Sequence, residues 1–346
     1  MEFHIIEKYE DFCLLEDNWE DLLTRIENPQ VFYKFQWAKN YLEFYEPQWK
    51  DFLCIVVGYE NKKLTALFPF VLVNKTIRFI TSQTTDYNMI CIDNSINRFS
   101  AMKKGIEYLL GNKKIDGFDL NCIPGSSVLY LLEEILREMN YSAFIRESTI
   151  TPTIKSPTDS VEKFNKKQIA NIRRRQRNLE KEHEVELKTG NILSERVLQF
   201  IAKCKTSKYD TSNMQHDNVL EFYRKLSSNL AENMFVNELY VDKQLVAAHL
   251  GFCDEKKIYY YIPTYDEKYA VNGVGKLMLN MLIDEETKGR EFDFLRGNEG
   301  YKFDYCDESG MIFNLIAYRK GSTHTIMQRT INALKNNSFI RKIMGQ

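Results

Sequence analysis

The sequence predicts an α+β protein built from two copies of one unit that follow each other along the chain. Three observations lead to this expectation. The chain has 346 residues, which is more than one ordinary core accommodates and indicates two domains. Hydrophobic residues make up 44% and charged residues 27%, as in globular proteins. Both halves repeat one order of apolar patterns: helices, antiparallel strands, a helix and a further strand.

Residues 1–150 form the first predicted domain, in which helical and strand patterns alternate. Its expected elements, in order, are two strands at 52–73 around a polar turn at Glu60–Lys63, a strand, loop and strand at 76–93, an amphipathic helix at 100–112, a strand at 116–123, and a helix at 126–141 that Ser126 or Ser127 caps.

A stretch at 146–160 has two prolines and many hydroxyl side chains, which predicts a linker before the second domain at 151–320. The elements expected in that domain are a Lys- and Arg-rich helix at 161–183, helices around 194–205 and 215–232, three strands with tight turns at 234–266, a helix at 274–289, and strands at 291–295 and 311–321. Residues 321–346 form an expected basic C-terminal helix.

Composition excludes several classes of protein. The net charge of −1 provides no global field for nucleic acid or membranes, so no DNA partner is expected. The seven cysteines contain no C-x-x-C pair, which favours free thiols in a reducing compartment and no metal site. The longest apolar run, at 64–73, is too short to span a bilayer, and the N-terminal residues lack a signal-peptide pattern. We therefore expect a cytoplasmic protein.

A glycine turn precedes the helix expected at 274–289. Val271–Gly275 holds the only G-x-G of the chain. Glycines let the backbone approach a ligand, and the N–H groups at a helix N-terminus attract an anion. The alternative is an ordinary loop with two convenient glycines. A dinucleotide fold is not expected, because Met278 occupies the place of the third glycine of that motif.

This order of strands, glycine turn, helix and strand resembles the GNAT acyltransferase superfamily. The stretches 245–252, 259–279 and 292–305 narrow the resemblance to a tandem-GNAT group, which includes cellulose-biosynthesis acetyltransferase-like proteins and Fem-type peptidyltransferases of cell-wall synthesis. The loop 84–90 and the helix 164–181 also fit. The resemblance covers roughly residues 15 to 320. It implies two tandem GNAT-like domains, each a mixed, mostly antiparallel sheet flanked by helices.

The resemblance implies acyl-coenzyme A (acyl-CoA), with acetyl-CoA first, as co-substrate, and no metal. In the family a loop of the form Q/R-x-x-G-x-G/A binds the pyrophosphate, whereas Ala270 stands here in the first position. A strand of the family offers backbone N–H groups to the acyl carbonyl. The implied cofactor-binding residues are Val246, Ala247 and Ala248 on that strand and Val271, Gly273, Val274, Gly275 and Lys276 at the turn.

Acyl transfer to an amine requires a polarised carbonyl, a neutral amine and a proton for the leaving thiolate. Lys302 is the candidate that offsets oxyanion charge, as the Fem-type resemblance implies, and Tyr301 the candidate proton donor. The alternative for Lys302 is a surface lysine lying over Tyr305. Asp266 is a candidate for orienting the amine, or else a turn carboxylate.

The first half lacks a G-x-G and is the expected acceptor side, with Asp86 and Tyr87 as candidate substrate-binding residues. Arg173 and Arg174 of the basic helix are candidates for an anionic part of the acceptor, such as a nucleotide-sugar diphosphate or a lipid phosphate. The alternative is a solvated charged face. The basic residues of 321–346 either form a packed helix or contact an anionic membrane at its inner face.

Three functions fit these features. The first is an N-acyltransferase that moves an acyl group from acyl-CoA to an amine of an amino sugar or a cell-envelope polysaccharide precursor. The second is a Fem-type transferase that uses aminoacyl-tRNA. The third is a non-catalytic member that binds a precursor. The retained G-x-G favours the first, and Ala270 keeps the third open.

Overall fold

The computed structural model describes residues 1–155, 165–208, 212–287 and 289–321. The chain forms two compact units. The first unit comprises Met1–Phe35, Gln48–Ser148 and the residues from Ile312 on, and the second comprises Gln36–Pro47 and Thr149–Met311. The units are interleaved in the sequence, whereas the sequence analysis divides the chain into consecutive ranges.

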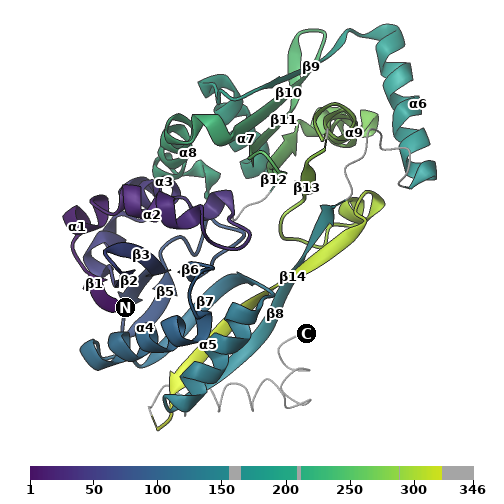
Figure 1. The fold of residues 1–346 in the computed structure, drawn as a ribbon. Helices are drawn as coiled ribbons and strands as arrows, with labels where there is room; N and C mark the ends of the chain where they lie inside the picture. Colours follow the sequence, from purple (N-terminus) through teal and green to yellow (C-terminus); the bar gives the residue numbers. More distant parts are fainter. Residues whose placement is uncertain (156–164, 209–211, 288, 322–346) are drawn as a thin grey trace, which may run out of the picture. The chain divides into compact units, whose positions relative to one another are not determined.

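The first unit contains two sheets (Figure 1). One has the strand order β1 (Glu2–Ile6), β2 (Ile55–Glu60), β3 (Lys63–Phe68), β6 (Cys91–Ile92). The other has the order β4 (Phe70–Val73), β5 (Thr76–Phe79), β7 (Gly117–Pro124), β14 (Glu308–Arg319). Its helices are α1 (Tyr9–Cys13), α2 (Glu16–Leu23), α4 (Arg98–Asn112) and α5 (Ser127–Glu138), with 3-10 turns at Val31–Tyr33 and Pro47–Phe52.

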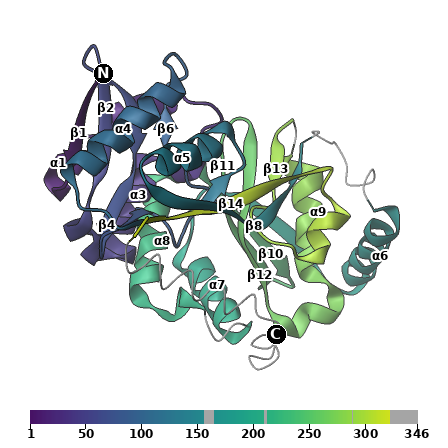
Figure 2. The ribbon, with the colours of Figure 1, turned by 90° about the horizontal axis from the view of Figure 1, so that it is seen from below.

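The second unit is built on one sheet with the order β8 (Tyr141–Ile154, which belongs to this unit from Thr149 on), β13 (Glu291–Asp293), β12 (Lys257–Tyr265), β11 (Gln244–Cys253), β10 (Met234–Val241), β9 (Val185–Gly190). Its helices are α3 (Phe35–Asn40), α6 (Lys166–Glu182), α7 (Glu195–Lys208), α8 (Asp217–Asn229) and α9 (Val274–Glu286), with shorter turns at Tyr41–Tyr45, Asn213–Gln215, Ala231–Asn233, Glu267–Asn272 and Gly300–Asp304. Helices α6 and α9 lie on one side of the sheet, and α7 and α8 lie on the other (Figures 1 and 2).

Short turns with a left-handed backbone fix the hairpins. Asn61 and Lys62 join β2 to β3 with φ of 50° and 65°, and Asp242 and Lys243 join β10 to β11 with φ of 48° and 63°. Two consecutive positive φ angles produce the turn whose twist matches that of the flanking strands, and Asn and Asp tolerate this backbone. The polar turn predicted at Glu60–Lys63 is confirmed.

Each unit contains a short parallel pair of strands separated by a helix. In the first unit Thr76 and Ile77 of β5 pair with β7 across α4, and in the second Lys257–Tyr259 of β12 pair with β13 across α9. The other registered pairs within the units are antiparallel. The predicted fold class, with mostly antiparallel sheets flanked by helices, is confirmed.

Two predicted elements differ in the structure. The linker prediction is wrong for 146–154, because these residues belong to β8. Alternating Thr and Ile suit a pleated strand, and their hydroxyl content resembles that of a linker. The last strand, β14, was predicted as part of the second domain. Its residues Ile312–Tyr318 instead pair with β7 of the first unit.

The structure also shows the state of the cysteines and of the apolar helices. All seven cysteines are unbridged. Over the described ranges, no helix combines the length and the apolar character needed to cross a bilayer. The basic C-terminal helix predicted at 321–346 lies outside the described residues except for Gly321.

Candidate functional site

The glycine turn begins helix α9. Gly273 has a φ of +70° and is both the C-cap of the Glu267–Asn272 turn and the N-cap of α9. Leu277 N–H donates to Gly273 O at 2.9 Å and closes the first helical turn. Val274 is fully buried, whereas Val271 is 81% exposed. The turn is thus anchored by Val274, and the first N–H groups of α9 lack helical acceptors.

Gly275 lets α9 approach the end of β12. A Cβ on Gly275 would lie 2.9 Å from Cδ1 of Tyr265, the last residue of β12. The Lys208 Nζ from α7 lies 5.0 Å from the centroid of the same ring. The tip of β12 is therefore enclosed by the start of α9 and the end of α7.

Strand β12 separates from β13 after Tyr259. The parallel pairing covers only Lys257–Tyr259. Immediately beyond it, two β12 residues, Tyr260 and Tyr261, lie opposite the single residue Gly251 of β11. Such a β-bulge bends the strand that carries the extra residue. The strands diverge, and the edge of β12 facing β13 opens.

Beyond its own end, β13 turns away as well. Leu295 has a left-handed backbone with φ of 59°, which is unusual for a non-glycine residue. Its N–H donates to the Asp293 carboxylate at 2.8 Å. This contact fixes the bend on the β13 side of the opening.

His249 fills the bulge. Its Nε2 accepts the Tyr261 N–H at 3.2 Å, so Nδ1 carries the proton that it donates to Asn237 Oδ1 at 2.7 Å. Burial, helped by the charge of Lys205, lowers the pKa of His249 to about 3. A Cβ on Gly251 would lie 2.3 Å from the imidazole, which explains the glycine there. His249 is a neutral residue that holds the bulge.

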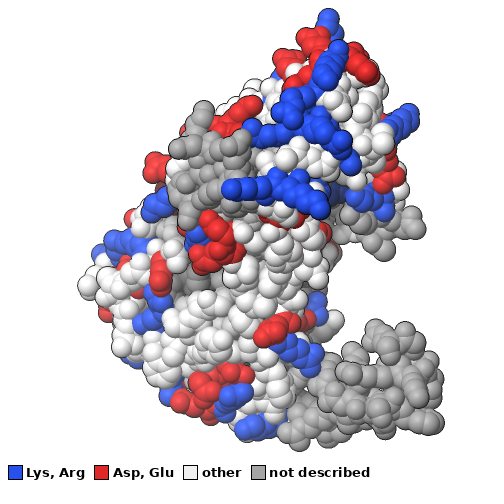
Figure 3. All heavy atoms as spheres, turned by 90° about the vertical axis from the view of Figure 1, so that its right-hand side faces the viewer, with Lys and Arg blue, Asp and Glu red and all other residues white. Residues whose placement is uncertain are grey.

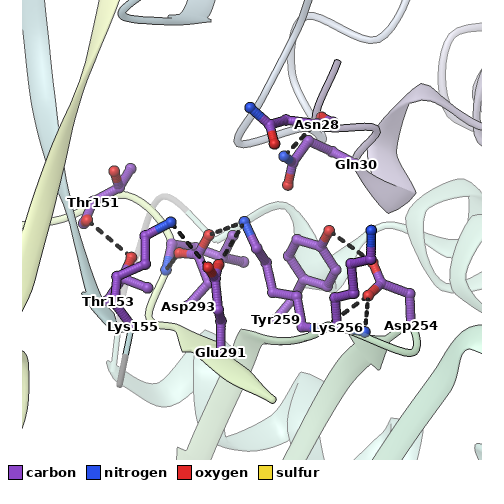
Figure 4. Close-up of polar contacts among 12 residues, drawn as sticks. Asn28, Gln30, Thr151, Thr153, Lys155, Asp254, Lys256, Tyr259, Glu291 and Asp293 are labelled. Carbon is purple, nitrogen blue, oxygen red and sulfur yellow. Dashed lines mark hydrogen bonds and ion pairs between the residues drawn. The ribbon is translucent and has the colours of Figure 1, made fainter. Parts of the chain in front are cut away.

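Ion pairs hold the paired end of the two strands together (Figure 4). Lys257 Nζ lies 3.6 Å from Glu291 and 3.6 Å from Asp293, and Lys155 Nζ lies 3.0 Å from Glu291. The Tyr259 hydroxyl donates to Asp254 at 3.1 Å. The strands are therefore fixed where they pair and open where they diverge.

The sequence predicts that backbone N–H groups of Val246, Ala247 and Ala248 contact the acyl carbonyl, but β11 is an interior strand. Val246 O accepts the Asp266 N–H, and Ala247 and Ala248 pair with β10 on one edge and β12 on the other. The open edge belongs to β12. Because successive residues of a strand point their N–H groups to opposite edges, the Tyr265 N–H points away from β11. The unpaired edge for the expected backbone contact is therefore that of β12.

Lys302 is buried, with 4% exposure, so the alternative of a surface lysine is wrong. Its Nζ donates to Arg296 O at 2.8 Å and lies 3.0 Å from Glu299 Oε2. A Cβ on Gly297 would lie 2.8 Å from that ammonium and 2.2 Å from Glu299 Oε2. The glycine beside the Tyr-Lys pair therefore makes room for an ion pair.

Lys205 on α7 interacts with the same cluster, and the sequence analysis missed it. Burial, with the charges of Lys208 and Lys302, lowers the pKa of Lys205 to about 8, and Glu299 acts in the opposite direction. Burial acts to raise the pKa of Glu299, but the hydrogen bond and charge of Lys302, the backbone hydrogen bond of Glu299 and the charge of Lys205 together lower it. In the sequence Lys205 resembles Lys203, which is exposed on the same helix, so only its environment distinguishes it.

Tyr301 and Asp266 occupy different settings. Tyr301 is half-buried and packs on the core beneath α9. Asp266 accepts the Lys268 N–H at 3.0 Å and caps the Glu267–Asn272 turn, which is the geometry of the turn-carboxylate alternative. Its predicted role in orienting an amine stays a prediction.

Asp86 and Tyr87 lie in the first unit, in the loop between β5 and β6. Their exposures are 7% and 6%. The ring of Tyr87 lies 6.0 Å from that of Phe32, and Asn88 N–H donates to Cys122 O at 2.8 Å. Both side chains are therefore buried in the loop. Their role in acceptor binding stays a prediction.

Helix α6 brings arginines toward α9 and the glycine turn. Arg173 Nη2 lies 3.2 Å from Asp284 of α9, while Arg174 is exposed and donates to Asn171 within α6. Arg175, which the sequence analysis did not select, donates from Nη1 to Val271 O at 3.1 Å. Figure 3 faces the side of the molecule that carries α6 and shows Lys and Arg side chains gathered in its upper part.

Comparison with known proteins gives one match to a family model and several structural neighbours. Residues 166–303 match the family model described as acetyltransferase (GNAT) domain. No curated protein matches the chain. FemX is similar in structure with a TM-score of 0.61 and 9% identity, over 91% of this chain and 97% of FemX.

Two further structures share the fold. A conserved protein of unknown function from Bacteroides thetaiotaomicron has a TM-score of 0.56 and 12% identity, over 92% of this chain and all of its own. L-PGS from Bacillus licheniformis has a TM-score of 0.50 and 12% identity, over 80% and 88%. Within the described ranges no cluster of side chains is suited to a metal ion. Residues 166–303 are thus similar to the acetyltransferase (GNAT) domain, which supports an acyl-CoA N-acyltransferase.

Proposed function

We propose that this enzyme moves an acyl group from acyl-CoA, acetyl-CoA first, to the primary amine of an amino sugar or another cell-envelope polysaccharide precursor. The observation that carries the proposal is the glycine turn that begins α9 beside the open edge of β12. The GNAT match of residues 166–303 supports the donor. The acceptor class follows from the resemblance of the sequence.

The donor would lie along the turn and the strand. Its pyrophosphate fits the N–H groups at the start of α9, where the helix dipole favours an anion. Its thioester fits the open edge of β12, where the Tyr265 N–H is a main-chain donor for the carbonyl oxygen. Gly275 keeps this path free of a side chain at the tip of the strand.

The chemical step needs a base and a positive charge. The amine nitrogen attacks the thioester carbon, the C–N bond forms, and the C–S bond breaks. Lys205, whose pKa is lowered to about 8, takes the proton that the amine loses. Lys302 offsets charge on the oxyanion, and Tyr301 donates a proton to the leaving thiolate. Asp266 orients the amine.

The acceptor side rests on fewer observations. Asp86 and Tyr87 contribute to acceptor binding, and the exposed Arg174 with Arg173 suits an anionic group such as a diphosphate. The basic residues of 321–346 place the enzyme against the inner face of an anionic membrane. No DNA takes part. These acceptor-side roles are part of the proposed function.

Calorimetry with the full chain tests the donor. Acetyl-CoA is expected to bind wild-type protein, and Gly275→Glu is expected to abolish binding because it adds bulk and negative charge at the turn. Gly275→Ala is the matched control, since its Cβ meets the same Tyr265 ring without charge. Equal affinity of the Glu and Ala variants would sink the proposed binding mode.

Mass spectrometry of products tests the acceptor. Wild-type protein is incubated with acetyl-CoA and a panel of amino sugars and nucleotide-linked amino sugars, and one of them is expected to gain 42 Da, the mass of an acetyl group replacing hydrogen. Binding of aminoacyl-tRNA without acetyl-CoA binding would support the Fem-type function instead. Precursor binding without any product would support the non-catalytic one.

A further inference from the structure

The glycine turn itself supplies little positive charge. The segment Ala270–Gly275 has no charged side chain. Lys276, the next residue, has its ammonium 3.5 Å from Asp304. A pyrophosphate carries more negative charge than backbone N–H groups alone neutralise. A cation from another part of the chain would therefore strengthen pyrophosphate binding at the turn.

Arg175 of α6 lies directly against the turn. Its Nη1 donates to Val271 O at 3.1 Å. The atom nearest to a Cβ built on Gly273 is the same Nη1, at 3.2 Å. The guanidinium therefore lies beside the left-handed residue that begins α9, next to the N–H groups that lack helical acceptors.

Helix α6 holds this arginine in place. Ile169, Ile172 and Leu179 are buried in the core beneath α9. At the start of the helix, Asn165 Nδ2 donates to Asp304 Oδ1 at 2.9 Å. Further along the helix, Arg173 lies 3.2 Å from Asp284 of α9. The position of the guanidinium is thus set by packing on both sides of it along the helix.

The guanidinium keeps donors for an anion. In the described ranges Arg175 forms no ion pair with a carboxylate, in contrast to Arg173. A guanidinium has five N–H donors in a planar fork that matches phosphate oxygens. The contact with Val271 O uses part of this capacity, and Arg175 remains exposed.

We propose that Arg175 is the residue that grips the pyrophosphate of acyl-CoA, and that α6 thereby supplies the cation which Ala270 does not. This inference rests on the proposed use of acyl-CoA. It assigns binding of acyl-CoA to Arg175. Of the other arginines of α6, Arg173 pairs with α9, and Arg174 and Arg177 are exposed.

The test compares two arginines and two ligands in the full chain. Arg175→Met is expected to weaken CoA binding in calorimetry by roughly tenfold or more, as for a lost charge-assisted contact. Arg177→Met, an exposed arginine on the same helix, is expected to change it less than about twofold. S-acetyl-pantetheine, which lacks the pyrophosphate, is expected to bind wild-type and Arg175→Met protein equally.

A rescue variant separates a local role from a structural one. Ala270→Arg in the Arg175→Met background restores a cation at the turn and is expected to recover most of the CoA affinity. If wild-type protein binds CoA and Arg175→Met binds it as Arg177→Met does, the inference is overturned and the proposed function stands. If wild-type protein binds no CoA, both fail together.

Discussion

Lys302 shows how burial changes the surroundings of a single charge. A lysine ammonium with 4% exposure has lost most of its water, and Arg296 O and Glu299 replace that water. Desolvated charges act more strongly on a nearby reaction than exposed ones, because the local dielectric is lower. Two neighbouring residues, Glu299 and Lys205, share this environment.

Lys302→Met is predicted to slow acyl transfer on the order of 10²-fold while weakening donor binding much less, because an oxyanion contact acts mainly in the transition state. Single-turnover kinetics and calorimetry measure the two effects. Glu299→Gln is the companion variant, since it removes the partner charge and keeps the ammonium. A Lys302→Met enzyme at full rate with its natural acceptor would remove this residue from the mechanism.

Lys205→Met is predicted to be more stable than wild type at pH 7 and slower in acyl transfer. The folded pKa of about 8 lies below the usual 10.5, so the fold disfavours the charged form. The destabilisation that charged Lys205 causes in the folded state is fully present below pH 8 and disappears as pH rises toward 10.5. Urea unfolding at pH 7 and pH 9.5 should show the variant's advantage, roughly 3 kcal/mol at pH 7, shrinking as the pH rises. A less stable variant with an unchanged rate would contradict both roles.

At the scale of elements, the opening of β12 depends on a bulge that several strands support. His249 links Tyr261 N–H on β12 to Asn237 on β10, and Asn237 Nδ2 donates to Thr189 on β9 at 3.0 Å. A buried polar chain of this kind is stable only when each member is satisfied. The neutral imidazole is therefore part of what shapes the strand edge.

His249→Gln is predicted to be less stable than wild type at neutral pH, with a difference that narrows in acid. The folded pKa of about 3 lies below the ordinary 6.5. The stability that neutral His249 contributes is present above pH 6.5 and is lost as pH falls toward 3, by up to about 1.4 kcal/mol per pH unit. Urea unfolding of both proteins at pH 7 and pH 5 measures it. A difference independent of pH would show that the imidazole is not held neutral.

At the scale of the whole molecule, the first unit needs a segment that is distant in sequence. Residues Ile312–Tyr318 pair with β7 of a unit whose other residues end at Ser148. Without that segment, β7 becomes a long unpaired edge, and such edges pair with other chains. Strand β7 contains buried Phe118 and Leu120, which adds apolar surface to the exposed edge.

A fragment of residues 1–150 is predicted to aggregate or to unfold without cooperativity, although its boundaries follow the expected first domain. Joining residues 308–321 to its end through a flexible linker should restore a cooperative monomer. Size-exclusion chromatography and urea unfolding compare the two. A monomeric 1–150 fragment that unfolds cooperatively would show that β14 is dispensable for the unit.

The sequence predicts the positions of helices and strands better than it predicts which strands pair with one another. Period-2 patterns and turn residues such as Asn61–Lys62 identify the hairpins, because both signals are local. The pairing of β14 with β7 leaves no local signal, since apolar alternation shows which face is buried and not which strand lies beside it.

The same limit applies to the site. The glycine turn and Lys302 are visible as motifs, whereas Arg175 and Lys205 acquire their roles only through contacts distant in sequence. His249 lies within an apolar strand, and only the bulge opposite Gly251 explains it. Motif order favours Val246–Ala248 over β12, because it does not show which strand edge stays unpaired.

The interleaving of the units also sets an order of events during translation. Ribosomes add about 5–20 residues per second, so some ~10–30 s separate the synthesis of Ser148 from that of Arg319. Throughout this interval the nascent first unit lacks its last strand, and all residues of the second unit are synthesised before that strand is complete. The N-terminal unit of this protein is thus finished last, and a chaperone that shields β7 would act on the growing chain rather than on the released one.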